Sequence, residues 1–343
     1  MKAMVLKGPN LPFELEQRPD PAAGPGEAVA RVITCGAGLT IQHAKAGRRK
    51  VQFPRIIGHE ITGEIVEAGP GVRGLKVGDP VTTYFYLNCG HCRWCLTSVE
   101  PLCENSGGQI GLECDGAYAE YVKLPAQNFI KLPDGLDYKK NPAEIGVVTD
   151  ALATPYKVLR RARVKAGETV AVFGAGGGLG IHQLMMAKWA KARVIAVDTK
   201  PNKFDACRKA GADEVVDASA GRVVEQLLEL TGGQGVDVVV DYVSATATLE
   251  AGAKSLARRG RLVTLGGSGQ PFQASSADML NKEQDLLGSR YVTRSEVLES
   301  LDLVARGEVF PLVSVVRPLE EAEAVHELVE RGEVIGRAAL RIA

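Results

Sequence analysis

The chain has 343 residues, of which 45% are hydrophobic and 24% charged, a composition typical of a globular protein with a sizeable core. At about 150 residues per domain, this length predicts two domains. The 41 Lys and Arg residues balance 41 Asp and Glu residues, which disfavours nucleic-acid binding because nucleic-acid binders normally carry a basic excess. No apolar run reaches the roughly 18 residues of a membrane span, and the N-terminal residues lack the apolar stretch of a secretory signal. We therefore expect a cytoplasmic protein without nucleic-acid or membrane partners.

Residues 1–150 alternate short apolar runs with Gly and Pro turns. This pattern predicts strands at residues 28–34, 61–68, 80–86 and 117–124. Helical periodicity is scarce there, so an irregular, mostly β domain is expected.

The pattern changes near residue 150, where Val-rich strands begin to alternate with helices of about ten residues. Such alternation predicts βαβ units and a parallel sheet, whose strands are apolar because both faces are covered. The predicted strands are 169–173, 193–198, 215–216, 236–243 and 261–265, and the predicted helices are 181–190, 201–210, 223–230 and 249–257. Beyond about residue 290, two helices (296–305 and 319–331) and a closing strand (338–342) are expected.

A glycine turn follows the first strand of this second region. Gly174, Gly177 and Gly180 are spaced three apart, and Leu179 stands where the strict G-x-G-x-x-G pattern requires its last glycine. The G-x-x-G-x-x-G variant meets the same physical need, a tight turn that brings backbone close to a pyrophosphate at a helix N-terminus. The candidate cofactor-binding residues of this turn are Gly174, Gly176, Gly177, Gly178, Leu179 and Gly180.

Asp198 ends the next predicted strand, about 20 residues after the turn, where a carboxylate would accept hydrogen bonds from the adenosine ribose. A carboxylate there repels a 2′-phosphate, so we predict NAD rather than NADP as cofactor. Lys200 and the candidate contact Lys203 lie nearby and favour a phosphate. Val243, at the end of a later strand, completes the candidate cofactor contacts.

Four of the seven cysteines form the pattern C-x2-C-x2-C-x7-C, with Cys89, Cys92, Cys95 and Cys103. An odd number of cysteines in a chain without an export signal argues against a disulfide framework, so clustered cysteines indicate metal ligands. The bacterial iron–sulfur pattern would end in C-x3-C-P, which this run does not. Four thiolates close a tetrahedral zinc site without an open position, so a structural zinc is predicted.

The glycine turn, the acidic residue and the four-cysteine loop together resemble the zinc-containing medium-chain alcohol dehydrogenases over essentially the whole chain. Gly58-His59-Glu60 is similar to the family segment that holds a catalytic-zinc ligand, His59, with Glu60 beside the metal. The resemblance implies that Asp150 is the third ligand, that Thr40 and His43 relay the alcohol proton, and that Arg337 contacts the cofactor pyrophosphate. Taken by itself, Asp150 could equally cap a helix that begins near Ala151.

One ligand of the family pattern is missing, because Gly38 stands where the family has a zinc-binding cysteine. Three accounts remain open. In the first, His59, Glu60 and Asp150 hold a weaker catalytic zinc. In the second, the site is metal-free and reduces an activated C=C or C=N bond, with Thr40 or Tyr86 as proton donor. In the third, the site is inactive and the fold serves nucleotide binding or a structural role.

The resemblance implies a Rossmann-type NAD-binding domain at residues 151–290, with a β-rich GroES-like catalytic domain formed by residues 1–150 and 291–343. It also implies an active site in the cleft between the two domains, where a small alcohol/carbonyl pair would react. A homotetramer or homodimer is a further implication of the resemblance. The expected activity is NAD(H)-dependent oxidoreduction of an alcohol, most readily a secondary one.

Overall fold

The computed structural model describes residues 1–267 and 269–343 and divides the chain into two compact units. Unit 1 comprises Met1–Ala153 and Val292–Ala343, and unit 2 comprises Thr154–Tyr291. Unit 2 is therefore one continuous segment inserted into unit 1. In the part of the chain that is described, no helix has both the length and the apolar character needed to cross a bilayer.

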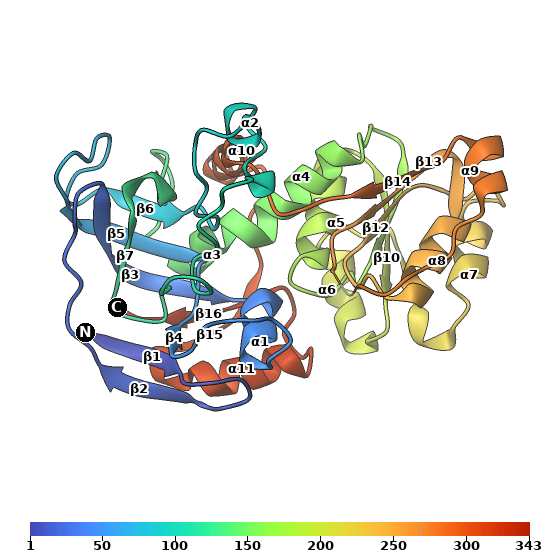
Figure 1. Ribbon diagram of the computed structural model, residues 1–343. Helices are drawn as coiled ribbons and strands as arrows, with labels where there is room; N and C mark the ends of the chain where they lie inside the picture. Colours follow the sequence, from blue (N-terminus) through green and yellow to red (C-terminus); the bar gives the residue numbers. More distant parts are fainter. Residues whose placement is uncertain (268) are drawn as a thin grey trace. The chain divides into compact units, whose positions relative to one another are not determined.

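Unit 1 is built on two β-sheets (Figure 1). The larger sheet has the order β15-β16-β3-β5-β6-β8, and β7 also pairs with β3. Its strands are β3 (Glu27–Ala37), β5 (Ile61–Ala68), β6 (Pro80–Thr83), β7 (Tyr121–Pro125), β8 (Phe129–Lys131), β15 (Val313–Pro318) and β16 (Arg337–Arg341). The smaller sheet has the order β2-β1-β4, with β1 (Lys2–Leu6), β2 (Phe13–Gln17) and β4 (Arg55–Ile56). The expected β-rich character of this unit is confirmed.

Short helices complete unit 1, and several of them carry no clear sequence periodicity. They are α1 (Leu39–Lys45), α2 (Arg93–Leu96), α3 (Pro142–Val147), α10 (Arg294–Ala305) and α11 (Ala322–Glu330). A π-helical turn, η3 (Val148–Leu152), follows α3 and leads into α4 (Ala153–Arg161). The strand expected at residues 117–124 begins only at Tyr121, because Ala117 and Tyr118 bond to the loop at Ile57 and Gly58 instead.

Unit 2 contains one six-stranded sheet in the order β11-β10-β9-β12-β13-β14, and every pairing is parallel. This is the doubly wound order, in which the chain reverses its direction of growth at the first strand. The strands are β9 (Thr169–Phe173), β10 (Arg193–Asp198), β11 (Glu214–Asp217), β12 (Val236–Asp241), β13 (Leu256–Thr264) and β14 (Asp285–Gly288). The predicted Rossmann-type parallel sheet is confirmed.

Helices cover both sides of this sheet in Figure 1, with α5 and α6 on one side and α7 and α8 on the other. Their bounds are α5 (Gly180–Trp189), α6 (Phe204–Lys209), α7 (Val223–Leu230), α8 (Thr246–Lys254) and α9 (Ser276–Lys282). The strands carry many β-branched side chains, which pack against these helices. One buried cluster joins the strand residues Ile195, Val197, Val216 and Val239 to Leu227 of α7 and Leu249 of α8.

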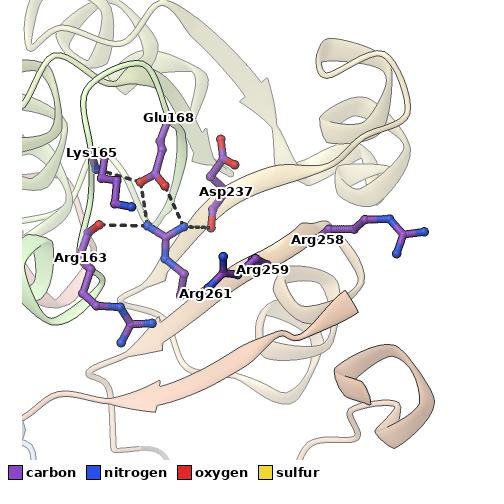
Figure 2. A pocket seen from close by; sticks show the side chains of 7 residues that line it. All are labelled: Arg163, Lys165, Glu168, Asp237, Arg258, Arg259 and Arg261. Atoms are coloured by element: carbon purple, nitrogen blue, oxygen red, sulfur yellow. Dashed lines mark hydrogen bonds and ion pairs between the residues drawn. The ribbon is translucent and has the colours of Figure 1, made fainter. Parts of the chain in front are cut away.

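A basic pocket lies at the amino ends of β9, β12 and β13 (Figure 2). Its central side chain, Arg261, is almost fully buried and donates to both Glu168 carboxylate oxygens, at 2.7 and 3.1 Å. The remaining donors reach the carbonyl oxygens of Ala162, Arg163 and Asp237. All of the guanidinium nitrogens have acceptors, so Arg261 ties the segment before β9 to two strands of the sheet.

Candidate functional site

The glycine turn connects the end of β9 to the start of α5 at the carboxyl ends of the parallel strands. Gly174 has φ +73°, in the left-handed region, and the Gly177 N–H bonds to the Gly174 carbonyl at 3.1 Å. A Cβ at Gly180 would collide with that same carbonyl oxygen. The turn therefore brings backbone against backbone and leaves no room for a side chain at Gly180, which is the geometry that a pyrophosphate-binding turn requires.

Asp198 ends β10 directly beside this turn. Its Oδ2 accepts a hydrogen bond from the Gly176 N–H at 2.8 Å, and its Oδ1 accepts one from the Lys200 N–H at 3.0 Å. Lys203 is also packed here: a Cβ at Gly176 would lie 2.6 Å from Lys203 Cδ. Burial lowers the pKa of the Lys203 ammonium. The structure thus brings Gly176, Asp198 and Lys203 together.

Val243 follows the end of β12 on the other side of the turn, where a Cβ at Gly174 would lie 3.1 Å from Val243 Cγ2. Its loop is held by Asp241, a fully buried residue that sequence reasoning did not single out. Asp241 Oδ1 accepts from the backbone N–H groups of Val243 and Ser244, at 2.8 and 3.0 Å, and Oδ2 accepts from the Thr248 hydroxyl. The sequence feature that could have identified Asp241 is a carboxylate at the end of an apolar, Val-rich strand.

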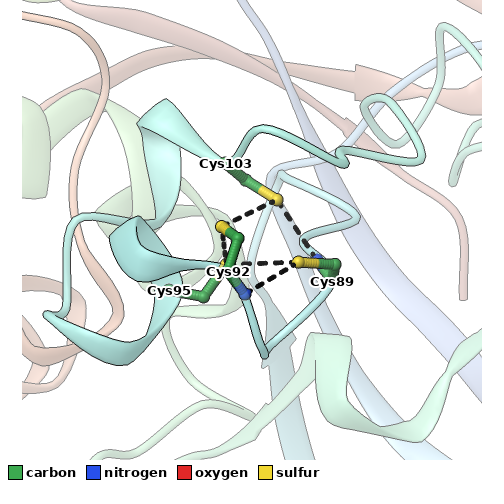
Figure 3. A group of neighbouring side chains, drawn as sticks. All are labelled: Cys89, Cys92, Cys95 and Cys103. Carbon is green, nitrogen blue, oxygen red and sulfur yellow. Dashed lines mark hydrogen bonds between the residues drawn. The ribbon is translucent and has the colours of Figure 1, made fainter.

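The four cysteines of the 89–103 loop converge on one point (Figure 3). The Sγ–Sγ distances are 3.5 Å for Cys92–Cys95 and 3.9 Å for both Cys89–Cys95 and Cys92–Cys103. Four sulfurs at about 2.3 Å from a tetrahedral zinc lie about 3.8 Å apart, so the cluster has the size of a zinc site formed by four thiolates. Hydrogen bonds from backbone N–H groups lower the pKa of Cys92 to about 6, which favours its thiolate, whereas burial raises the pKa of Cys95 to about 12.

A second cluster of ligating side chains lies in unit 1, where atoms of His59, Glu60 and Asp150 approach within 4.8 Å of one another. His59 and Glu60 directly precede β5 and follow Gly58, whose φ is +101°. A Cβ at Gly58 would lie 2.5 Å from the Tyr118 ring, so only glycine allows this entry into the strand. The His59 ring lies against Phe85, with 4.0 Å between ring centroids.

Asp150 reaches the cluster from the π-helical turn η3. The alternative of a helix cap is not observed, because Asp150 lies inside the helical run rather than before it, and its carboxylate is buried among charged groups. His59 Nε2 lies 3.7 Å from Asp150 Oδ2. Among the described residues, neither ring nitrogen of His59 has a hydrogen-bond partner, and Glu60 Oε2 has none either.

Arg337, for which the resemblance implied a contact with the cofactor pyrophosphate, lies at this cluster of side chains. The Arg337 side chain belongs to unit 1 and is only 5% exposed. Nη2 donates to Glu60 Oε1 at 2.6 Å and to Asp150 Oδ2 at 2.7 Å, and Nε donates to Glu60 Oε1 at 3.1 Å. The two carboxylates are thus bridged by a cation that belongs to the protein.

These contacts set the charge of the cluster. Burial raises the pKa of Glu60 to about 8, although Arg337 opposes the shift. The pKa of Asp150 is lowered: burial acts to raise it, but the contact with His59 and the charge of Arg337 outweigh burial. Burial also lowers the pKa of His59, which favours the neutral imidazole.

The family's ligand set for the catalytic metal is incomplete in this chain, and a cation of the protein occupies part of what remains. Gly38 supplies no ligand, and an ideal Cβ at that position would lie 2.8 Å from Arg337 Nη1. The Asp150 oxygen nearest His59 is the same oxygen that Arg337 holds. Cys35, the nearest cysteine in sequence, is a fully buried residue of β3 and is not part of the cluster.

The two residues expected to relay a proton lie on α1. Thr40 and His43 are three residues apart on this helix, so their side chains share one face. Thr40 is half-buried and His43 is exposed. Tyr86, the other candidate proton donor, is buried against Phe85.

Comparison with known proteins agrees with this architecture. Residues 24–134 match the alcohol dehydrogenase GroES-like domain, and residues 178–306 match the zinc-binding dehydrogenase domain. An alcohol dehydrogenase of Geobacillus stearothermophilus is 34% identical over the whole of both chains. An acryloyl-coenzyme A reductase of Metallosphaera sedula is 32% identical over 99% of each.

A solved alcohol dehydrogenase of the archaeon Aeropyrum pernix superimposes with a TM-score of 0.91 at 33% identity, covering 99% of this chain and 100% of that one. The matches extend over both units, including the parallel sheet with its glycine turn and the β-rich unit with its cysteine loop. The chain therefore belongs to the zinc-containing medium-chain alcohol dehydrogenase family and is an alcohol dehydrogenase-like oxidoreductase.

Proposed function

We propose that this protein transfers hydride between NAD(H) and a small alcohol/carbonyl pair, most readily a secondary alcohol and its ketone. The observation that carries the proposal is the placement of Asp198 beside the glycine turn at the carboxyl ends of β9 and β10. Open α/β sheets bind their ligands at this edge. When bound, NAD(H) would supply the hydride acceptor for oxidation of the alcohol and the hydride donor for reduction of the carbonyl.

The residues of unit 2 would bind and orient the dinucleotide. The turn from Gly174 to Gly180 would accept the pyrophosphate against backbone N–H groups, and Asp198 would accept hydrogen bonds from the ribose hydroxyls. A 2′-phosphate would meet the Asp198 carboxylate, so NAD(H) is preferred to NADP(H). Lys203 is held against Gly176 and would lie beside the same ribose.

The residues of unit 1 would transfer the proton that is released or consumed with each hydride. Oxidation of an alcohol releases one proton from its hydroxyl, and reduction of a carbonyl consumes one. We propose that Thr40 passes this proton and that His43, exposed on the same face of α1, exchanges it with water. His59, Glu60 and Asp150 would form a polar wall of the site.

A second candidate activity is the reduction of a C=C bond conjugated to a carbonyl. It is favoured by the Arg337 bridge, because such a substrate is activated by its own carbonyl and needs no ligated metal. The similarity to an acryloyl-coenzyme A reductase supports this candidate without making it the better one.

Two measurements test these proposals. Titration with NADH and NADPH, followed by cofactor fluorescence, is expected to show tighter binding of NADH, and Asp198→Ser should reduce this preference. A substrate panel of secondary alcohols, ketones, enones and α,β-unsaturated thioesters then separates the two activities. Turnover of alcohols supports the first, and turnover of unsaturated substrates alone supports the second. Tight NADH binding without any turnover would contradict both and favour a binding role.

We also propose a structural zinc in the cysteine loop and a homo-oligomer, either a homodimer or a homotetramer. The four free thiols fit a reducing compartment such as the cytoplasm. Light scattering coupled to gel filtration measures the oligomeric state, and a monomer at micromolar concentration would contradict that part of the proposal.

A further inference from the structure

The register of the large sheet places Arg337 next to the position of the missing cysteine. Ala338 of β16 pairs with Ala37 of β3 in an antiparallel ladder. The preceding residue of β16, Arg337, therefore lies beside the residue that follows Ala37, which is Gly38. The last strand of the chain and the end of β3 thus determine together what fills this space.

Glycine at position 38 is what admits the guanidinium. A Cβ at Gly38 would lie 2.8 Å from Arg337 Nη1, 2.9 Å from Cζ and 3.1 Å from Nη2. Real Cβ atoms essentially never approach closer than 3.0 Å, so with any larger residue at position 38 the guanidinium, at the end of a flexible side chain, would have to shift. The guanidinium of Arg337 therefore occupies the space that a cysteine side chain at position 38 would fill.

We propose that Arg337 replaces the divalent cation of this site: its guanidinium, admitted by Gly38, permanently bridges Glu60 and Asp150 and keeps zinc from binding there. The proposal rests on the proposed function only where it takes this cluster to be the site of hydride transfer. That Arg337 stands in place of a metal ion is argued from the contacts within unit 1 alone. Arg337 acts as a positioning residue that fixes both carboxylates.

Competition for oxygen atoms is the physical reason for the exclusion of metal. Arg337 Nη2 bonds to both Glu60 Oε1 and Asp150 Oδ2. A divalent ion bound to His59 Nε2 would compete for Asp150 Oδ2, which lies 3.7 Å from that ring nitrogen. Binding would strip a buried guanidinium of an acceptor and place a second positive charge within a few ångströms of it, at the low effective dielectric of a buried site.

The test is the zinc content per subunit of the full-length protein, measured by elemental analysis before and after incubation with excess zinc chloride and desalting. We expect one zinc in both samples, and none in Cys89→Ser/Cys92→Ser. The variant Gly38→Cys/Arg337→Met restores a thiol and removes the competing cation, and it is expected to gain a second zinc. Gly38→Cys alone adds a thiol but leaves Arg337 to compete for the carboxylates, and Arg337→Met alone removes the competing cation but adds no thiol, so each is expected to gain less than a full equivalent.

Two zinc ions per wild-type subunit, with the second lost in Asp150→Asn, would overturn the proposal. A folded double variant that stays at one zinc would also contradict it. Should the double variant not fold, the comparison of wild type with Asp150→Asn decides, because the proposal requires equal zinc content in the two. NADH titration of the same samples is independent of this count, so failure of the cofactor proposal is distinguishable from failure of the Arg337 assignment.

Discussion

At the scale of single residues, the buried side chain of Arg337 is expected to stabilise the folded state of unit 1. Its guanidinium has two carboxylate partners, and both are themselves buried. Removing one member of such a group leaves the others charged and unpaired in a region of low dielectric, and this costs more than the ion pair contributes over an apolar replacement.

Arg337→Met is therefore expected to lower the free energy of unfolding by about 3–5 kcal/mol, the usual effect of breaking a buried ion pair. Urea denaturation followed by circular dichroism measures it. The matched control is Arg331→Met, since Arg331 forms ion pairs with Glu327 and Glu333 at the surface, where such pairs contribute up to about 1 kcal/mol. Equal effects of the two substitutions would show that the Arg337 bridge is not stabilising.

His326 is the centre of a second buried polar network. The Tyr118 hydroxyl lies 2.9 Å from His326 Nε2, and Gln42 Oε1 lies 2.7 Å from Nδ1. Gln42 in turn donates through Nε2 to Glu330, which Arg48 holds. Because Oε1 is an acceptor, Nδ1 carries the proton and Nε2 accepts from Tyr118, so the network requires a neutral imidazole.

Burial lowers the pKa of His326 to about 3, whereas histidine in an unfolded chain has a pKa of about 6.5. Between these values the unfolded chain binds a proton that the folded protein does not. The stabilising effect is thus fully present above pH 6.5 and is lost as the pH falls toward 3, at up to about 1.4 kcal/mol per pH unit. Urea denaturation at pH 7.5, 6 and 5 should show a smaller pH dependence for His326→Gln than for wild type. His91→Gln, which removes an exposed imidazole, should keep the wild-type dependence.

At the scale of an element, the glycine turn depends on close approach of backbone atoms. The carbonyl of Gly174 lies where a Cβ at Gly180 would have to be, so Gly180→Ala would push α5 away from the turn. Backbone N–H groups at the helix N-terminus would then no longer converge on a phosphate.

We expect Gly180→Ala to weaken NADH binding at least tenfold, a loss of about 1.4 kcal/mol. Fluorescence titration with NADH measures the effect. Gly288→Ala in β14 is the control, because nothing lies within 4 Å of a Cβ at that position. Unchanged affinity in Gly180→Ala would contradict the assignment of this turn to the pyrophosphate.

The cysteine loop has little other structure to hold it. Its only helix among residues 89–103 besides one 3-10 turn is the four-residue α2, which has no buried residue. Zinc removal is therefore expected to loosen the loop, since bound metal contributes free energy directly to local folding. Treatment with a chelator should lower the melting temperature and open a protease-sensitive site between Cys89 and Cys103. Resistance of the loop to protease after zinc removal would show that protein contacts alone hold it.

At the scale of the whole molecule, the chain is divided asymmetrically. Unit 2 is one continuous segment, Thr154–Tyr291, with its own sheet and its own buried cluster. Unit 1 is interrupted, because β15, β16, α10 and α11 return after the insertion and β16 pairs with β3.

A fragment containing residues 154–291 is therefore expected to fold and to bind NADH, whereas residues 1–153 alone should not fold without β16. Dispersed amide resonances in a proton–nitrogen correlation spectrum would confirm the first expectation. A collapsed spectrum for residues 154–291 would show that unit 2 depends on unit 1.

The elements that were predicted best are those in which local sequence and burial agree. The strands at residues 61–68, 169–173 and 193–198 and the helix at 223–230 have the bounds that were expected. The two parallel strands, 169–173 and 193–198, are continuous apolar runs because both of their faces are covered. The antiparallel strand at 61–68 is bounded by glycine turns, and the helix at 223–230 shows the periodicity of an amphipathic helix. Short elements such as β4 and α3 were missed, since two to six residues carry too little periodicity and are held by tertiary contacts.

The sequence by itself determined the Rossmann-type sheet, the glycine turn with Asp198, and the cysteine loop. In each of these, the chemistry depends on spacing along one continuous segment. Only the tertiary structure decided the contacts of Arg337. Gly38, Glu60, Asp150 and Arg337 come from four distant segments, and sheet register, the π-helical turn and the absence of a Cβ at position 38 bring their atoms together. No local pattern encodes that arrangement, because each partner is buried by a different part of the fold.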